Sequence, residues 1–336
     1  MLLNADFKTF QKHFETHLAE MLSPDELGAF ILVLANSLQD VHLQRVLAPQ
    51  LATTFAALKK RHIQNSLKAG DDDLHVFEAL LQSGIENYHA WEHKSLDPWR
   101  AAFNPFRALR PQRASSEKFV KLKRVFDEQR FHFDKPFLKP EIISEEQFNG
   151  QAIRVLYHKF PLVAYHLLIL LDPQGHHPQF MSASSNQLAW ELTSHRAESI
   201  PGFGLAYNSL GASASVNHLH LHGFVETVPF SIENKIWQHN RGTRRYPLQC
   251  HPAHSTDESW AFIEKLHDSN QPYNLLYRPS VCYVIPRPPQ GLRKLPDWLP
   301  DAGWYELCGG FNLLRHHHFE GLNIEEVEAG LSKLKL

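Results

Sequence analysis

The chain has 336 residues, and 43% of them are hydrophobic, which is enough to bury a large core in one big domain or two fused ones. Its 34 Lys and Arg residues balance 36 Asp and Glu residues, and the net charge of −2 excludes a general attraction for nucleic acid. Three scattered cysteines exclude a disulfide framework and a CxxC zinc site, so we expect a cytoplasmic protein. We expect neither a secretion signal nor a membrane span, because no segment reaches about 18 consecutive apolar residues.

The N-terminal part of the chain is expected to be helical. Apolar residues recur at helical spacing from Pro24 to Leu38 and from Leu51 to Leu67. Asp71–Asp73 resembles a helix start, and it predicts a further helix over 75–91. We therefore predict a helical region over residues 1–95, with no recognisable chemistry of its own.

The residue composition of the sequence changes from Pro98 onward. Two segments rich in proline and turn residues predict irregular loops over a sheet, namely 103–113 and 131–140. Short β-like runs are expected at 152–157, 166–171, 204–208, 216–225, 274–277 and 280–285, with helices at 184–195 and 257–266. The predicted fold class is α+β, an antiparallel sheet with helices on one face.

The run Ser215-Val-Asn-His-Leu-His-Leu-His-Gly-Phe224 carries the clearest chemical signal. In a strand over 216–224, the period of two places His218, His220 and His222 on one face and the intervening leucines on the other. Three imidazoles on one face suit a core poorly, because each has a polar donor and acceptor that burial must satisfy. We therefore expect the histidines to face a cleft.

An imidazole can attack phosphorus and form a labile phosphoramidate, which divides one nucleotidyl transfer into two displacements. His220 is the best placed of the three because it is central. Its attacking nitrogen must be unprotonated, and its other nitrogen must donate to a neighbouring histidine or a backbone carbonyl.

This run, together with Tyr207-Asn-Ser-Leu-Gly211, resembles the signature of the histidine-triad (HIT) superfamily, and most closely its branch of GDP-D-glucose and GDP-L-galactose phosphorylases. Segments 165–171 and 284–291 extend the resemblance over roughly residues 100–295. It implies a HIT-like antiparallel sheet over 96–336, possibly as two fused HIT-like halves at about 96–230 and 231–336.

The resemblance also implies roles for individual residues. It places the nucleophile at His220, which would carry a covalent nucleotidyl group, with His218 and His222 contacting phosphate on either side. Asn208 and Ser215 match the phosphate-side Asn and Ser of the family, and His166 matches an upstream histidine. The expected reaction is phosphorolysis of a nucleoside diphosphate sugar of the GDP-hexose type, with no cofactor and no metal.

The third histidine bears on the alternatives. Galactose-1-phosphate uridylyltransferases and dinucleoside-tetraphosphate phosphorylases have Gln at that position, whereas hydrolases and GDP-hexose phosphorylases have His, as at His222. A HIT hydrolase or a dinucleoside polyphosphate phosphorylase therefore stays open. The long helical N-terminus does not resemble the eukaryotic GDP-hexose enzymes.

A phosphorylase must also hold a second anion, and arginine can bind phosphate oxygens in a two-point contact. Arg107, Arg110 and Arg113 recur at three-residue spacing, and Arg287 follows an apolar run. For Arg107, Arg110 and Arg113, the competing interpretation is an ordinary solvated charge on the protein surface. The expected ligands are a nucleotide sugar or dinucleotide and inorganic phosphate; we expect no nucleic acid and no membrane partner, and the oligomeric state stays open.

Two other classes compete with the transferase. His220, His222 and Glu226 satisfy the His-x-His-xxx-Glu spacing by which cupin barrels bind iron or manganese, although the flanking glycines of that motif are missing. A nucleotide-binding protein without catalysis is the third hypothesis, and the complete triad disfavours it.

Overall fold

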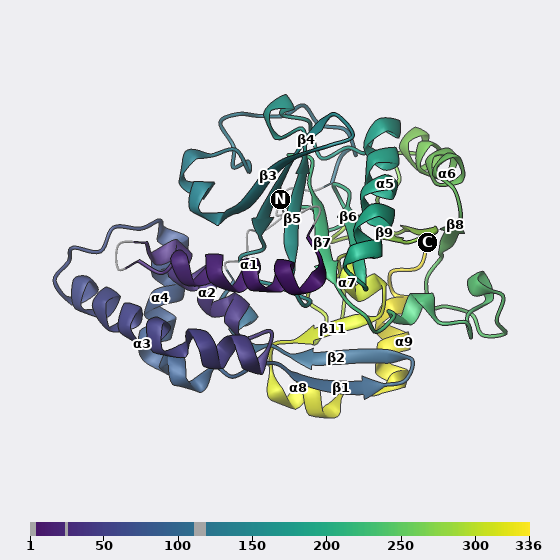
Figure 1. Ribbon diagram of the computed structural model, residues 1–336. Coiled ribbons are helices and arrows are strands. Elements are labelled where there is room, and N and C mark those ends of the chain that lie inside the picture. The colour runs from purple at the N-terminus through teal and green to yellow at the C-terminus, as the bar shows by residue number, and fades with distance from the viewer. Residues whose placement is uncertain (1–4, 24–25, 111–118) are drawn as a thin grey trace.

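The chain folds around two β-sheets, as the computed structural model of residues 5–23, 26–110 and 119–336 shows (Figure 1). The larger sheet has eight strands in the order β3-β4-β5-β7-β6-β9-β10-β8, and all its neighbouring strands are antiparallel. Its strands are β3 (Ile142–Phe148), β4 (Gln151–Tyr157), β5 (Leu167–Leu171), β6 (Phe203–Asn208), β7 (Leu221–Val225), β8 (His251–Ala253), β9 (Tyr273–Arg278) and β10 (Val281–Pro286). The predicted α+β class with an antiparallel sheet is confirmed.

Neither sheet closes on itself within the part of the chain that the structure describes. The cupin hypothesis is therefore wrong, because that motif needs a barrel. Glu226, its third ligand, instead forms an ion pair with Arg100 at 3.3 Å. Strands from both predicted halves share the large sheet through the β6–β9 pairing, and a division into halves near residue 230 stays a prediction.

The smaller sheet joins distant parts of the chain. Strands β1 (Glu92–Leu96) and β2 (Trp99–Phe103) form a hairpin, and β11 (Gly310–Leu313) pairs with β2 in parallel. None of these three strands was predicted from the sequence, and the helix predicted over 75–91 is too long. The helix ends at Ser83 because Gly84 adopts a positive φ of 77°, which a helix cannot continue.

The described residues of the N-terminal region form four α-helices: α1 (Phe7–Glu20), α2 (Leu27–Ser37), α3 (Val41–Ile63) and α4 (Asp71–Ser83). Local side chains begin two of them, because Asp6 and Asp40 accept hydrogen bonds from first-turn amides. The remaining helices are α5 (Ala183–Ser199), α6 (Thr256–Asp268), α7 (Trp304–Leu307), α8 (His316–Gly321) and α9 (Ile324–Ser332). None of the described helices is both long and apolar enough to cross a membrane.

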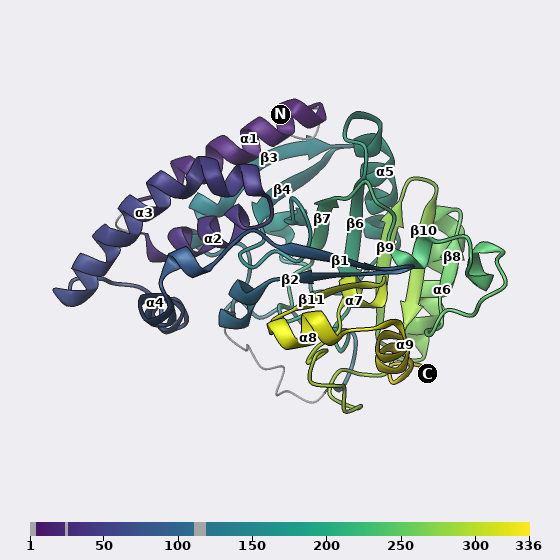
Figure 2. The same cartoon turned by 90° about the horizontal axis from the view of Figure 1, so that it is seen from below.

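The two faces of the large sheet pack differently. Helices α1, α2, α5 and α6 cover one face in a single hydrophobic core, to which the sheet contributes side chains such as Tyr157, Ile169 and Leu221. On the opposite face, Phe224 and Leu276 pack against the small sheet and α7–α9, which Figure 2 shows from below. Further along this face, Leu168 packs under the loop that contains Phe133. The second face is thus covered by two separate clusters.

The strand predicted over 216–225 is shorter than expected. It pairs with its neighbours only from Leu221 onward, so residues 216–220 approach the sheet as a loop. His218 and His220 therefore lie before the strand, and His222 lies within it. Five predicted strands agree with the structure to within about two residues, namely those over 152–157, 166–171, 204–208, 274–277 and 280–285. The helix predicted over 257–266 agrees at both ends to the same accuracy, and the helix predicted over 184–195 agrees at its start.

Candidate active site

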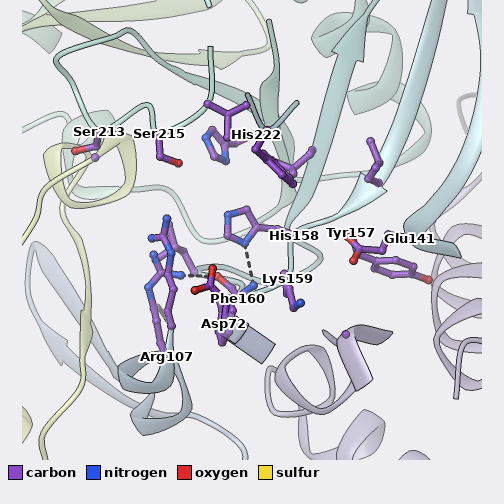
Figure 3. Close-up of a pocket in the computed structure, with 18 of the residues that line it drawn as sticks. Asp72, Arg107, Glu141, Tyr157, His158, Lys159, Phe160, Ser213, Ser215 and His222 are labelled. Atoms are coloured by element: carbon purple, nitrogen blue, oxygen red, sulfur yellow. Dashed lines mark hydrogen bonds between the residues drawn. The ribbon is translucent and has the colours of Figure 1, made fainter. Parts of the chain in front are cut away.

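A cavity of about 940 Å³ opens between the two clusters on the second face of the sheet. It is lined by six of the residues singled out from the sequence, namely Arg107, Arg110, Asn208, Ser215, His220 and His222. His218, His166 and Arg287 are not part of this lining, and Arg113 lies outside the described residues. Figure 3 shows Arg107, His158, Ser215 and His222 around the same hollow, although they come from separate segments of the chain.

The ring of His220 is held in one orientation. Its Nδ1 lies 2.7 Å from the carbonyl oxygen of His218, so Nδ1–H donates and Nε2 carries the lone pair. The Phe133 ring contacts it edge-on, with centroids 4.9 Å apart. Burial lowers the pKa of His220 to about 4, so the ring is neutral at neutral pH. An unprotonated, oriented imidazole is what a nucleophile requires.

His166 fixes the tautomer of His222. The backbone N–H of Leu162 donates to His166 Nδ1 at 3.1 Å, so the proton of the neutral His166 ring is on Nε2. That Nε2 lies 3.0 Å from His222 Nδ1 and donates to it. Burial lowers the pKa of both rings well below the usual range, and His222 therefore carries its single proton on Nε2.

Asn208 presents a second donor to the same place. Its Oδ1 accepts hydrogen bonds from the Trp304 amide at 2.9 Å and from Asn274 Nδ2 at 2.6 Å. This orientation leaves Asn208 Nδ2 facing His222 Nε2 at 3.3 Å. Two N–H groups that face each other cannot satisfy one another, and both residues line the cavity. The pair is therefore built for an acceptor oxygen that takes both protons.

His158, which was not predicted from the sequence, belongs to this cluster. It stacks on His166 with centroids 4.1 Å apart and planes 3° apart, and its Nδ1 accepts from the Phe160 amide. Nitrogens of His158, His166 and His222 lie within 4.8 Å of one another. Stacked rings direct their lone pairs in parallel rather than toward one ion, and the His166–His222 hydrogen bond already uses two of the nitrogens. The geometry therefore fits a stacked and hydrogen-bonded cluster better than a metal centre.

The arginines divide into two groups. Arg107 donates to the Phe160 carbonyl oxygen, and burial and the nearby Arg110 lower the pKa of Arg107 to about 9. Both guanidinium groups line the cavity, where an anion would relieve their mutual repulsion. Arg287 is instead buried against the Pro288 and Ala302 carbonyl oxygens, so it supports the segment beside the cavity.

His218 has surroundings of its own. Its Nδ1 accepts the Phe133 amide at 3.2 Å, and its ring lies among those of Phe126, His132 and His176. Its carbonyl oxygen, rather than its ring, contacts His220. A direct phosphate contact by the His218 ring stays a prediction.

The open antiparallel sheet with a histidine cluster on one face has a HIT-like fold, and a solved structure has the same fold. The yeast Ap4A phosphorylase Apa2 in complex with Ap4A matches 80% of this chain and 99% of its own, with a TM-score of 0.51 and 15% sequence identity. At that identity the likeness establishes the fold alone.

Residues 99–224 match the family described as GDPGP1-like, N-terminal domain. The GDP-D-glucose phosphorylase 1 of Danio rerio is 30% identical over 123 residues, which are 37% of this chain and 35% of that protein. The GDP-L-galactose phosphorylase 1 of Arabidopsis thaliana is 30% identical over 206 residues, or 52% of this chain and 46% of its own. The chain thus spans less than half the length of these relatives. The predicted relationship to the GDP-hexose phosphorylases is confirmed.

Proposed function

We propose that this protein transfers a nucleotidyl group through a covalent intermediate on His220, and that inorganic phosphate is the acceptor. The observation that carries the proposal is the His220 ring, whose Nδ1–H is bound to the His218 carbonyl oxygen while the ring lines a cavity with two arginines. The proposed substrate is a nucleoside diphosphate hexose, because the sequence relatives are GDP-D-glucose and GDP-L-galactose phosphorylases.

In the first displacement, His220 Nε2 attacks the α-phosphorus and forms a P–N bond. The bond between that phosphorus and the bridging oxygen breaks, and hexose 1-phosphate leaves with the electron pair. In the second displacement, an oxygen of inorganic phosphate attacks the same phosphorus, the P–N bond breaks, and GDP is released. His220 returns to its neutral form, so one histidine serves both steps.

The two facing donors, Asn208 Nδ2 and His222 Nε2, suit a non-bridging phosphate oxygen whose negative charge develops during attack. Arg107 and Arg110 suit the leaving phosphate and then the incoming one, because both steps place a second anion beside the transferred group. A hydrolase would need such a site only for the leaving phosphate of the first step, whereas a phosphorylase uses it in both steps.

The test compares products in the presence and absence of phosphate. With GDP-glucose as substrate, added phosphate should give GDP and glucose 1-phosphate, and His220→Asn should abolish both products. GMP as the main product at millimolar phosphate would identify a hydrolase and leave His220 as nucleophile. Parallel reactions with GDP-L-galactose and Ap4A test the substrate class, and a clear preference for Ap4A would overturn the sugar assignment.

A further inference from the structure

The ladder between β6 and β7 opens at the nucleophile. The two strands pair from Phe203 with Val225 to Ala206 with His222, and the same register would continue through residues 207 and 221 to Asn208 with His220. That pair does not form, although the two residues stay close. The side chain of Gln179, which is fully buried, fills the opening between them.

The Gln179 carboxamide bonds to both polar groups of the His220 backbone. Its Oε1 accepts from the His220 amide at 2.9 Å, and its Nε2 donates to the His220 carbonyl oxygen at 3.2 Å. The same Nε2 donates to the Asn208 carbonyl oxygen at 2.9 Å. One side chain thus takes the place of the missing ladder bonds and ties the nucleophile's residue to β6.

Gln179 is itself held at its backbone. Its N–H donates to Asn217 Oδ1 at 3.0 Å, and its carbonyl oxygen accepts from the Tyr207 hydroxyl at 3.1 Å. Two residues earlier, the His177 carbonyl oxygen accepts from the Leu219 amide at 2.8 Å. The segment 177–179 therefore runs beside the loop that carries His220, and it is fixed on both sides.

We propose that Gln179 is a positioning residue for His220, and the catalytic part of this proposal rests on the proposed function. By holding the His220 backbone off the β-ladder, Gln179 allows the ring to turn its Nδ1–H onto the carbonyl oxygen two residues earlier. That bond in turn fixes Nε2 as the attacking atom. A carboxamide suits this place because it offers a donor and an acceptor in one plane, whereas a carboxylate offers only acceptors.

Two substitutions separate the parts of this contact. Gln179→Met keeps the length of the side chain and removes all three hydrogen bonds, while Gln179→Glu keeps the acceptor for the His220 amide and loses the donor. Asn186→Leu is the matched control. Asn186 is an equally buried carboxamide that bonds to Ser259 and Tyr277, away from the histidines.

The first readout is the rate at which the protein forms the nucleotidyl adduct in a single turnover. Gln179→Met should slow adduct formation by about 10²-fold, because small misplacements of reacting groups cost rates of that order. Gln179→Glu should lie between Met and the wild type, and the dissociation constant of the substrate should change less than about threefold in both. Asn186→Leu should keep the wild-type rate well below its melting temperature.

The second readout does not depend on the reaction. Nitrogen-15 NMR of the histidine rings should show the Nδ1–H tautomer of His220 in the wild type and a mixture of tautomers in Gln179→Met. An unchanged tautomer, or adduct formation within about threefold of the wild type, would overturn the proposal. Wild-type protein that never forms an adduct would overturn the proposed function, and the tautomer would then decide the role of Gln179. If Gln179→Met does not fold, Gln179→Glu decides by the same two criteria.

Discussion

The nucleophile should stay uncharged well below the pH at which an ordinary histidine becomes protonated. His220 is buried, and its pKa of about 4 lies below the ordinary histidine value of 6.5 because burial disfavours the charged ring. At about pH 5, roughly 90% of such rings are unprotonated, against roughly 3% of rings with the ordinary pKa. At that pH we therefore expect adduct formation to be about 30-fold faster than it would be if His220 had the ordinary histidine pKa.

The assay is a single turnover with GDP-glucose labelled at the α-phosphate, followed from about pH 4.5 to 8. Its two phosphates keep the same charge over this range, so a change in rate reports the protein. The acid limb of adduct formation should lie near pH 4, below this range, so the rate should fall by less than about half between pH 8 and 4.5. An acid limb near pH 6.5 would refute the argument that burial keeps His220 neutral.

Stability at low pH supplies the control for this experiment. The folded-state pKa of His220 is lowered, so its contribution to stability is complete above about pH 6.5 and is lost as the pH falls towards 4. At about pH 5 this loss amounts to about 2 kcal/mol relative to neutral pH. Urea unfolding at both pH values should show a loss about 2 kcal/mol smaller in His220→Asn than in the wild type, and an equal loss in both proteins would contradict the lowered pKa.

Two further substitutions test the groups around His220. Asn208→Ala removes one of the two donors that face the expected phosphate oxygen, so adduct formation should slow by about 10- to 10²-fold, as a lost charge-assisted hydrogen bond implies; a wild-type rate would remove Asn208 from the site. Arg110→Ala should slow adduct formation from GDP-glucose and raise the KM for phosphate, each at least about tenfold, because the leaving and the incoming phosphate use the same site. Single-turnover and steady-state kinetics measure the two effects, and wild-type values of both would remove Arg110 from the site.

The fold was predictable where a segment's own pattern decides its structure. Strand β5 is a continuous apolar run, because helices cover one of its faces and the cavity wall the other, and the run alone predicts a buried strand. The hairpin β1–β2 escaped prediction because its sequence shows no such run. Its order comes from a parallel pairing with β11, more than 200 residues away, and the pattern of the hairpin cannot show that contact.

The grouping of the candidate site residues was predictable in the same uneven way. His220, His222, Ser215 and Asn208 line one cavity, as the run of histidines and its resemblance predicted. His158 was missed because one histidine at the end of an apolar strand carries no distinguishing spacing. Its partner His166 pairs with it by stacking, which becomes visible only when β4 and β5 lie side by side.

The histidine run shows why part of an inference can survive when its premise fails. The alternation of side chains was argued from a strand over 216–224, yet His220 lies in a loop. Alternation needs only an extended backbone, and Gln179 supplies at His220 the hydrogen bonds that a neighbouring strand would have supplied. His220 and His222 consequently still share a cavity, while the His218 ring, one step further from the sheet, turns to Phe126 and His132. Side chains thus alternate between the two faces only as far as the backbone is hydrogen-bonded to a neighbour. At His220 that neighbour is Gln179, which lies in a loop some 40 residues earlier in the chain.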